Sequence, residues 1–281
     1  MAALPSGVLL PAVLSVLLVS LCGLFAHFFV VANGMGVPSG SNIFFVLYAR
    51  HERPFIALTA LFAVVALTLR ANGDGERWSA NVPAPTATVV GLLAVGVLLI
   101  GWLATSTLFH RFAMSMDEYN AHFQARIFAS GHLTAPLPSA YRGVVGGITP
   151  IFSTYLPQSA SWTTMYLPVY SAMRALFLLA GAEWLTNPVM AAASVILLAA
   201  VGRRMWPGDA GRQWIALLLL VTSSQFLITS ATAYAMPAHL CLNLLWLWLW
   251  LRGDRASLVA LPLVGALALG LHNPFPHALF V

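Results

Sequence analysis

The sequence predicts an all-α membrane protein, a polytopic bundle of transmembrane helices with one long loop outside the membrane. Two observations lead to this prediction. Of the 281 residues, 60% are hydrophobic and 7% are charged, whereas soluble globular domains carry about 25% charged residues. Long apolar runs also recur along the chain, and a membrane-spanning helix needs about 20 mostly apolar residues. The composition excludes a water-soluble enzyme, a secreted domain and a disordered chain.

The apolar runs predict about seven or eight spans. The run at 166–182 is interrupted by Arg174, and we expect it to form a re-entrant or surface helix. The first two spans and the loop after them make an N-terminal transmembrane hairpin over 1–85, and 86–281 forms the core. The chain stops inside a further apolar stretch, so we expect the core to be C-terminally incomplete. The expected spans are 8–32, 54–69, 86–109, 184–202, 214–230, 236–251 and 256–271.

Arginine in short loops indicates which ends of the spans face the cytoplasm. All 13 basic residues are arginine, and the clearest loops are 202–212 and 252–255. Placing both loops in the cytoplasm puts the long segment 110–165 on the outer face. The remaining arginines are scattered between apolar runs, which does not favour a nucleic-acid partner. We therefore expect a multi-pass protein of the plasma (inner) membrane, with its active site on the outer face.

Segment 110–165 contains a strong helical pattern over 116–130. Ser115 and Glu118 form an S-x-x-E capping box before it, and Gly131 follows its end. At about 100° per residue, one face of this helix is apolar and its flanks are polar. The apolar face consists of Met116, Tyr119, Phe123 and Ile127. The pattern is typical of an amphipathic helix that lies in the plane of the membrane surface.

Asp117 and Glu118 stand out because the chain has only 8 acidic residues. Neighbouring positions on a helix diverge by about 100°, so we expect the two carboxylates to have separate roles. At the start of a helix, the dipole and the free N–H groups favour an ionised Asp117. Such a carboxylate could accept a proton from an incoming hydroxyl or amine. The alternative is structural, with Glu118 capping the helix and Asp117 solvated.

Two arginines are candidates for binding a substrate or a phosphate group. Arg174 lies in the middle of an apolar helix, where a charge usually faces a cavity or a partner, and a guanidinium can bind phosphate through two hydrogen bonds. Its alternative is a salt bridge to Glu183 or Glu118. Arg142 lies in a glycine-rich loop, which either folds over a substrate or is a surface loop.

Four further side chains complete the candidate set. His239 and His272 lie at the outer ends of predicted spans, where each either binds a substrate or is a hydrogen-bonded interfacial residue. His122 and Arg126 share one flank of the 116–130 helix. The chain contains no recognised metal-binding or nucleotide-binding motif. No metal site and no cofactor are therefore assigned, and the sequence leaves a requirement for a divalent metal undecided.

A succession of short motifs runs from the 116–130 helix to the end of the core. The motifs are Met116-Asp117-Glu118-Tyr119, Gln124-Ala125-Arg126-Ile127, Tyr166-Leu-Pro168, Trp184-Leu-Thr-Asn187-Pro188, Gly202-Arg-Arg204 and Ser230-x-x-x-Tyr234. Their order resembles that of GT-C-fold glycosyltransferases, the polyprenyl-phosphate-sugar-dependent membrane enzymes akin to protein mannosyltransferases and lipid A aminoarabinose transferases. The resemblance covers roughly residues 87–275.

This resemblance implies an enzyme that moves a sugar from a polyprenyl phosphate to a lipid, glycan or protein acceptor within the membrane lipids. The acidic pair of the family maps onto Asp117, which would orient or deprotonate the acceptor, and onto Glu118, which would support the site. The departing lipid phosphate carries negative charge, which Arg174, Arg142 and His239 are expected to stabilise. Two non-enzymatic alternatives are a transporter or flippase for a lipid-linked saccharide and a scaffold subunit.

Overall fold

The chain divides into two units, Met1–Val82 and Pro83–Val281, and the second unit holds every candidate site residue. The predicted hairpin over 1–85 lies almost entirely outside the described residues, as does its span at 8–32. Of the span at 54–69, only six positions are described, and they are helical. The structure, a computed structural model, describes residues 57–58, 60–61, 64–65 and 82–278.

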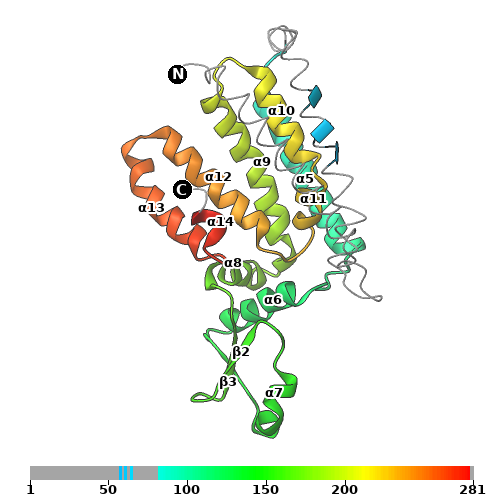
Figure 1. Cartoon of the computed structure of the whole chain (residues 1–281), viewed down its shortest axis with the longest axis vertical. Helices are drawn as coiled ribbons and strands as arrows, with labels where there is room; N and C mark the ends of the chain where they lie inside the picture. Colours follow the sequence, from blue (N-terminus) through cyan, green and yellow to red (C-terminus); the bar gives the residue numbers. More distant parts are fainter. Residues whose placement is uncertain (1–56, 59, 62–63, 66–81, 279–281) are drawn as a thin grey trace, which may run out of the picture. The chain divides into compact units, whose positions relative to one another are not determined.

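The described part of the second unit is mostly helical (Figure 1). Its α-helices are α5 (Ala87–Thr107), α6 (Met116–Ala129), α7 (Val145–Ile148), α8 (Pro168–Leu179), α9 (Thr186–Met205), α10 (Ala210–Val221), α11 (Ser224–Ser230), α12 (Met236–Arg252), α13 (Arg255–Leu269) and α14 (Phe275–Ala278). Two 3-10 helices accompany them, η2 (Ser139–Val144) and η3 (Glu183–Leu185).

Two of the described helices, α5 and the combined helix Glu183–Met205, are long and apolar enough to cross a membrane. The pair α10 and α11 makes a third span if its 54° bend is counted within one crossing. The span expected at 214–230 falls on this pair, and its helix breaks after Val221. The hydroxyl of Ser223 accepts a hydrogen bond from Phe226 N–H at 3.3 Å and starts α11 afresh.

The other predicted spans are shorter as helices than a full crossing requires. α12 has 17 residues and α13 has 15, compared with the roughly 20 that span a bilayer. α8 has 12 residues and is therefore about 18 Å long. This length agrees with the expectation that 166–182 does not cross the membrane. Length and composition thus support two or three spans among the described residues, where about seven or eight were expected for the whole chain.

The helices pack around two apolar clusters. In the first, α9 lies against α5, mostly through alanine and valine, whose small side chains let helices approach closely. In the second, α6 and α8 meet α12 and α13. The buried residues of this second cluster are Ala121, Tyr170, Ala235, Ala238, Leu242, Ala268 and Leu271. This second cluster supports the elements that carry the candidate site.

The all-α prediction missed a small β-sheet in the segment 110–165. The strands are β1 (Ala135–Pro136), β2 (Ser153–Leu156) and β3 (Ser161–Thr164), which form an antiparallel sheet in the order β1-β3-β2. β2 and β3 consist largely of serine, threonine and aromatic residues, several of which favour strands. Figure 1 shows the sheet on the side of α6 and α8 that faces away from the long helices.

The arginines of the two predicted cytoplasmic loops lie at one end of the helical unit. Arg203 and Arg204 lie at the end of α9, and Arg252 lies at the end of α12. Arg212 and Arg255 lie at the beginnings of α10 and α13. The side chain of Arg204 donates to Leu251 O at 3.3 Å, which joins the ends of α9 and α12. The opposite end of α9 lies beside α6. α9 has 20 residues, so about 30 Å separates the two ends.

Candidate functional site

α6, which carries both acidic residues, begins and ends where the sequence predicts. Ser115 precedes its first residue, and the Ser115 hydroxyl accepts a hydrogen bond from Glu118 N–H at 3.3 Å. At the other end Gly131 has a φ of +79°, and its N–H donates to Phe128 O at 2.9 Å. Glycine suits this left-handed closing position. The helix predicted over 116–130 is confirmed, and its position on a membrane surface stays a prediction.

Polar side chains of α6 hold the sheet. Asn120 and Gln124 are buried. Asn120 Nδ2 donates to Ile151 O at 2.9 Å, and Gln124 Oε1 accepts from Thr164 N–H at 3.0 Å. Tyr119, which belongs to the predicted apolar face, is instead 41% exposed. The face of α6 that contacts the rest of the protein therefore includes polar residues of the predicted flanks.

Glu118 lies in the protein interior, where it fastens the start of α6. Its side chain is 1% exposed, and Oε2 accepts a hydrogen bond from Ala233 N–H at 2.9 Å. Burial raises the pKa of Glu118, while hydrogen bonds from the backbone of Ala233 and Met114 oppose this rise. Because Ala233 belongs to the link between α11 and α12, Glu118 ties that link to α6.

Asp117 offers the more accessible carboxylate, since its side chain is only partly buried. Its Oδ1 accepts a hydrogen bond from the phenol of Tyr166, whereas Oδ2 accepts none from any residue that the structure describes. Burial, followed by the contact with Asp117, raises the pKa of Tyr166, so the phenol remains a donor. One oxygen of Asp117 is thus held in place by Tyr166, and the other meets no donor among the described residues.

Among the predicted basic residues, His272 contacts the ring of Tyr166. Its ring is 3.9 Å from the ring of Tyr166, measured between centroids. Burial lowers the pKa of His272, and the charge of Asp117 opposes this change. His272 Nδ1 lies 3.3 Å from Asn273 Nδ2. If the amide donates this bond, a neutral imidazole carries its proton on Nε2, which can then donate to a ligand.

Backbone contacts bring Tyr166 and His272 together. The first N–H groups of a helix lack partners within it, and here they bind the chain that follows α13. Leu167 N–H donates to His272 O at 3.2 Å, and Val169 N–H donates to Gly270 O at 2.9 Å. A β-carbon on Gly270 would lie 2.7 Å from Val169 Cγ2. Only glycine therefore permits this close approach.

Arg174 lies in a buried ion pair. Its side chain is 1% exposed, and Nη2 donates to Glu183 Oε1 at 2.6 Å. His122 Nδ1 lies 2.6 Å from the same oxygen, and the guanidinium lies 5.4 Å from the ring centroid of Trp184. The structure contains the salt bridge to Glu183 that the sequence left as the alternative to a phosphate-binding role.

Asn187, at the start of α9, makes further buried hydrogen bonds near this ion pair. Its Oδ1 accepts a hydrogen bond from the phenol of Tyr170 at 2.9 Å. Its Nδ2 faces three carbonyl oxygens, those of Thr229 at 3.3 Å, Thr232 at 2.7 Å and Tyr234 at 2.7 Å. This contact holds the α11–α12 link in the position where Ala233 can meet Glu118.

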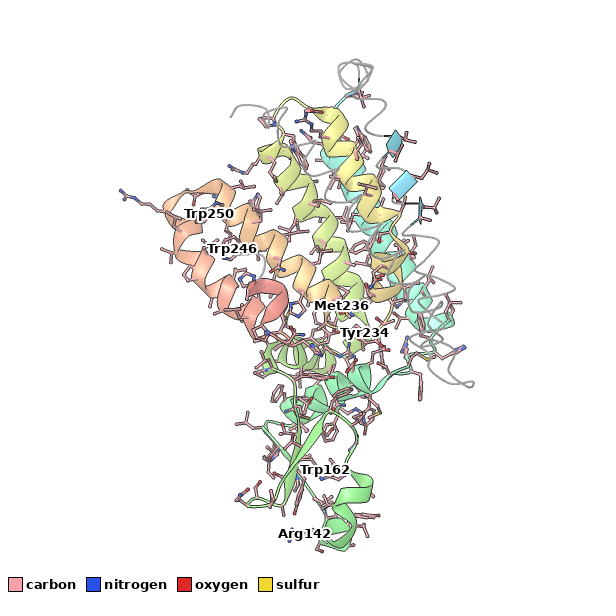
Figure 2. All side chains as sticks on the ribbon, in the orientation of Figure 1. Arg142, Trp162, Tyr234, Met236, Trp246 and Trp250 are labelled. Carbon is pink, nitrogen blue, oxygen red and sulfur yellow. The ribbon has the colours of Figure 1, made fainter. Side chains whose placement is uncertain are left out.

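Two of the predicted arginines lie away from Asp117. Arg142 is exposed in η2 at the far end of the sheet-bearing segment, as Figure 2 shows, and its Nε donates to Leu137 O at 3.4 Å. Arg126 is exposed on α6. It stands nine residues from Asp117, which places the two on opposite sides of the helix at about 100° per residue. The structure does not bring either arginine to the acidic group.

His239 is buried in the first turn of α12. It is 8% exposed, and within the described residues neither ring nitrogen has a hydrogen-bond partner. It interacts electrostatically with His272 and His277. The candidate site therefore consists of Asp117, Tyr166 and His272, with His239 nearby. Tyr166 was not a candidate from the sequence, although its motif Tyr166-Leu-Pro168 was noted.

The comparisons add no relative to this description. No protein family, no curated protein and no solved structure matches the chain. The described part of the chain also contains no group of three or more histidine, cysteine, aspartate or glutamate side chains that could hold a metal ion. The likeness to GT-C glycosyltransferases consequently remains a prediction from the sequence motifs.

Proposed function

We propose that this protein is a membrane glycosyltransferase, which moves a sugar from a polyprenyl-phosphate donor to a lipid, glycan or protein acceptor. The active site is on the outer face of the plasma membrane. The observation that carries the proposal is the hydrogen bonding and the location of Asp117. Its Oδ1 is held by Tyr166, its Oδ2 meets no donor among the described residues, and it lies at the end of the helices opposite the arginine-rich loops.

A single displacement accounts for the proposed reaction. The acceptor hydroxyl oxygen attacks the anomeric carbon and forms the new glycosidic bond. The bond between that carbon and the phosphate oxygen breaks, and its electron pair leaves with the lipid phosphate. Asp117 Oδ2 takes the hydroxyl proton as a general base. His272 then offers a neutral N–H donor to the leaving phosphate, a role assigned to Arg174 from the sequence alone.

An apolar groove supports the proposal that the sugar donor is linked to a lipid. The groove has a volume of about 490 Å³ and lies between α12, α13 and α14, which contributes His277 and Ala278. Trp246, labelled in Figure 2, forms part of its wall. The groove reaches Leu269, which is three residues before His272. An isoprenoid chain in the groove would therefore run toward the end of α13 where the candidate site lies.

The decisive experiment compares sugar transfer by wild type and Asp117→Asn. Asparagine keeps the shape of aspartate but cannot accept the proton, and general-base assistance is worth roughly 100- to 10,000-fold in rate. We expect a loss of this size in transfer from polyprenyl-phosphate pentoses and hexoses by the purified chain in nanodiscs. Donor binding, measured on the same preparations, should be kept.

Asp209→Asn is the matched control. Asp209 also lies at the start of a helix, where its carboxylate accepts from Arg212 N–H at 3.0 Å, but it lies at the arginine-rich end. Its variant should transfer sugar at the wild-type rate. Near-normal transfer by Asp117→Asn would remove Asp117 from the mechanism and favour a transporter or a scaffold.

A further inference from the structure

Phe152, the residue before β2, has a backbone conformation that residues other than glycine seldom adopt. Its φ is +66°, in the left-handed region where a β-carbon crowds the backbone. Such strain persists only where the surrounding structure imposes it, and it concentrates at functional sites. The ring of Phe152 is 39% exposed. Burial of the ring in a core is therefore not what compensates for the strain.

A buried side chain of α6 imposes this conformation. Asn120 Nδ2 donates to Ile151 O at 2.9 Å, and Asn120 Oδ1 accepts from the hydroxyl of Ser153 at 2.6 Å. Asn120 thus binds the residues on both sides of Phe152. The carbonyl of Phe152 also accepts from Met165 N–H at 2.9 Å. These contacts fix the backbone of Phe152 and therefore the direction of its Cα–Cβ bond.

The ring points toward the candidate site. Its centroid lies 5.6 Å from that of Tyr166, with 32° between the ring planes. Tyr166 in turn donates its phenol hydrogen to Asp117 and lies against His272. The rings of Phe152, Tyr166 and His272 therefore lie next to one another beside the Asp117 carboxylate, and Phe152 is partly exposed to solvent.

We infer that Phe152 and Tyr166 form an aromatic subsite that binds the apolar face of a sugar ring beside Asp117. The C–H groups on one face of a sugar carry slight positive charge, and the faces of aromatic rings carry negative charge. A sugar on these rings would place its hydroxyl groups within reach of Asp117. This inference rests on the proposed function, since it names where the substrate of that site binds.

Two sources could supply the sugar ring, namely the lipid-linked donor and a glycan acceptor. Both present the same chemistry to Phe152, so the experiment has one arm for each. Methyl glycosides of pentoses and hexoses represent the acceptor. Water-soluble short-chain prenyl-phosphate sugars represent the donor. Saturation-transfer NMR on the full chain in nanodiscs measures which ring protons contact the protein, and it requires no catalytic turnover.

Phe152→Gly and Phe152→Tyr are the test variants. Glycine adopts the left-handed backbone freely, so the melting temperature of Phe152→Gly should not fall, while its Kd for the sugar should rise about tenfold. Tyrosine keeps the ring and should bind like wild type. Tyr141→Gly removes an aromatic ring that is 53% exposed in η2, and it should bind the sugar normally.

The inference is overturned if Phe152→Gly binds both ligands as wild type does, or if wild type shows no saturation transfer to either ligand. Failure of the proposed function would give a different experimental result. A chain that binds a sugar through Phe152 but transfers none would support the subsite and contradict the transferase. Asp117→Asn should retain sugar binding, because it leaves the rings in place.

Discussion

Removing the positive charge of Arg174 should destabilise the fold strongly. In Arg174→Met, the carboxylate of Glu183 keeps only His122 as a partner among the described residues. Both members of the ion pair are buried, at 1% and 4% exposure, and their atoms are 2.6 Å apart. Breaking a buried pair by removing one member typically costs about 3–5 kcal/mol. Because His122 stays on the same oxygen, we expect a value near the lower end, about 3 kcal/mol.

Thermal unfolding in detergent measures this loss. For a chain of this size, about 3 kcal/mol corresponds to a fall in melting temperature of roughly 6–12 °C. The double variant Arg174→Met/Glu183→Gln removes both charges and should recover most of the loss. A matched control is Arg252→Met, whose partner Asp254 is exposed at 42%. Exposed pairs contribute little, so its stability should change by less than about 1 kcal/mol.

Two results would refute this reasoning. One is a loss below about 1 kcal/mol in Arg174→Met, which would mean that the buried pair contributes no more than a surface pair. The other is additivity, in which the double variant loses the sum of the two single losses. Additivity would mean that Arg174 and Glu183 do not interact.

Three further predictions test the surrounding structure. The pKa of Glu118 is raised above 4.5, so its contribution to stability is fully present below that value and is lost as pH rises through the folded-state pKa. The melting temperature should therefore decline less steeply with pH in Glu118→Gln than in wild type. An unchanged dependence of the melting temperature on pH would contradict the assignment. Gly270→Ala should cost about 1–3 kcal/mol by overpacking, whereas Gly96→Ala, which has open space around it, should not destabilise. Cysteines at Arg204 and Asp117, in a cysteine-free background, should react with an impermeant maleimide from opposite sides of the membrane, and labelling from one side would disprove the topology.

Features that depend on neighbouring residues were predicted well from the sequence. The apolar run at 86–109 corresponds to α5, and the run at 184–202 falls within the combined helix Glu183–Met205. Ser115 and Gly131 correctly marked the start and end of α6. These signals are local, because a bilayer demands consecutive apolar residues and a helix cap involves residues three or four positions apart.

Features that depend on distant residues were not predicted. The contact of Tyr166 with Asp117 joins residues 49 positions apart, and no local pattern announces it. The sequence left Arg174 with two partners because the choice depends on the turn after α8, which brings Glu183 back to it. The sheet escaped notice because its strands are short, and buried side chains of α6, Asn120 and Gln124, hold it in place.

The break between α10 and α11 has a consequence for how the chain enters the bilayer. α10 has 12 residues and α11 has 7, so the two pieces are about 18 Å and 10 Å long, and neither crosses a hydrocarbon core of about 30 Å. If the two pieces form one crossing, the insertion machinery must accept both as one segment. The break itself exposes few polar groups to lipid, since the hydroxyl of Thr222 donates to Leu218 O at 2.7 Å and that of Ser223 accepts from Phe226 N–H. Replacing Ser223 with alanine would remove the acceptor of Phe226 N–H, so insertion efficiency should fall although the segment becomes more hydrophobic.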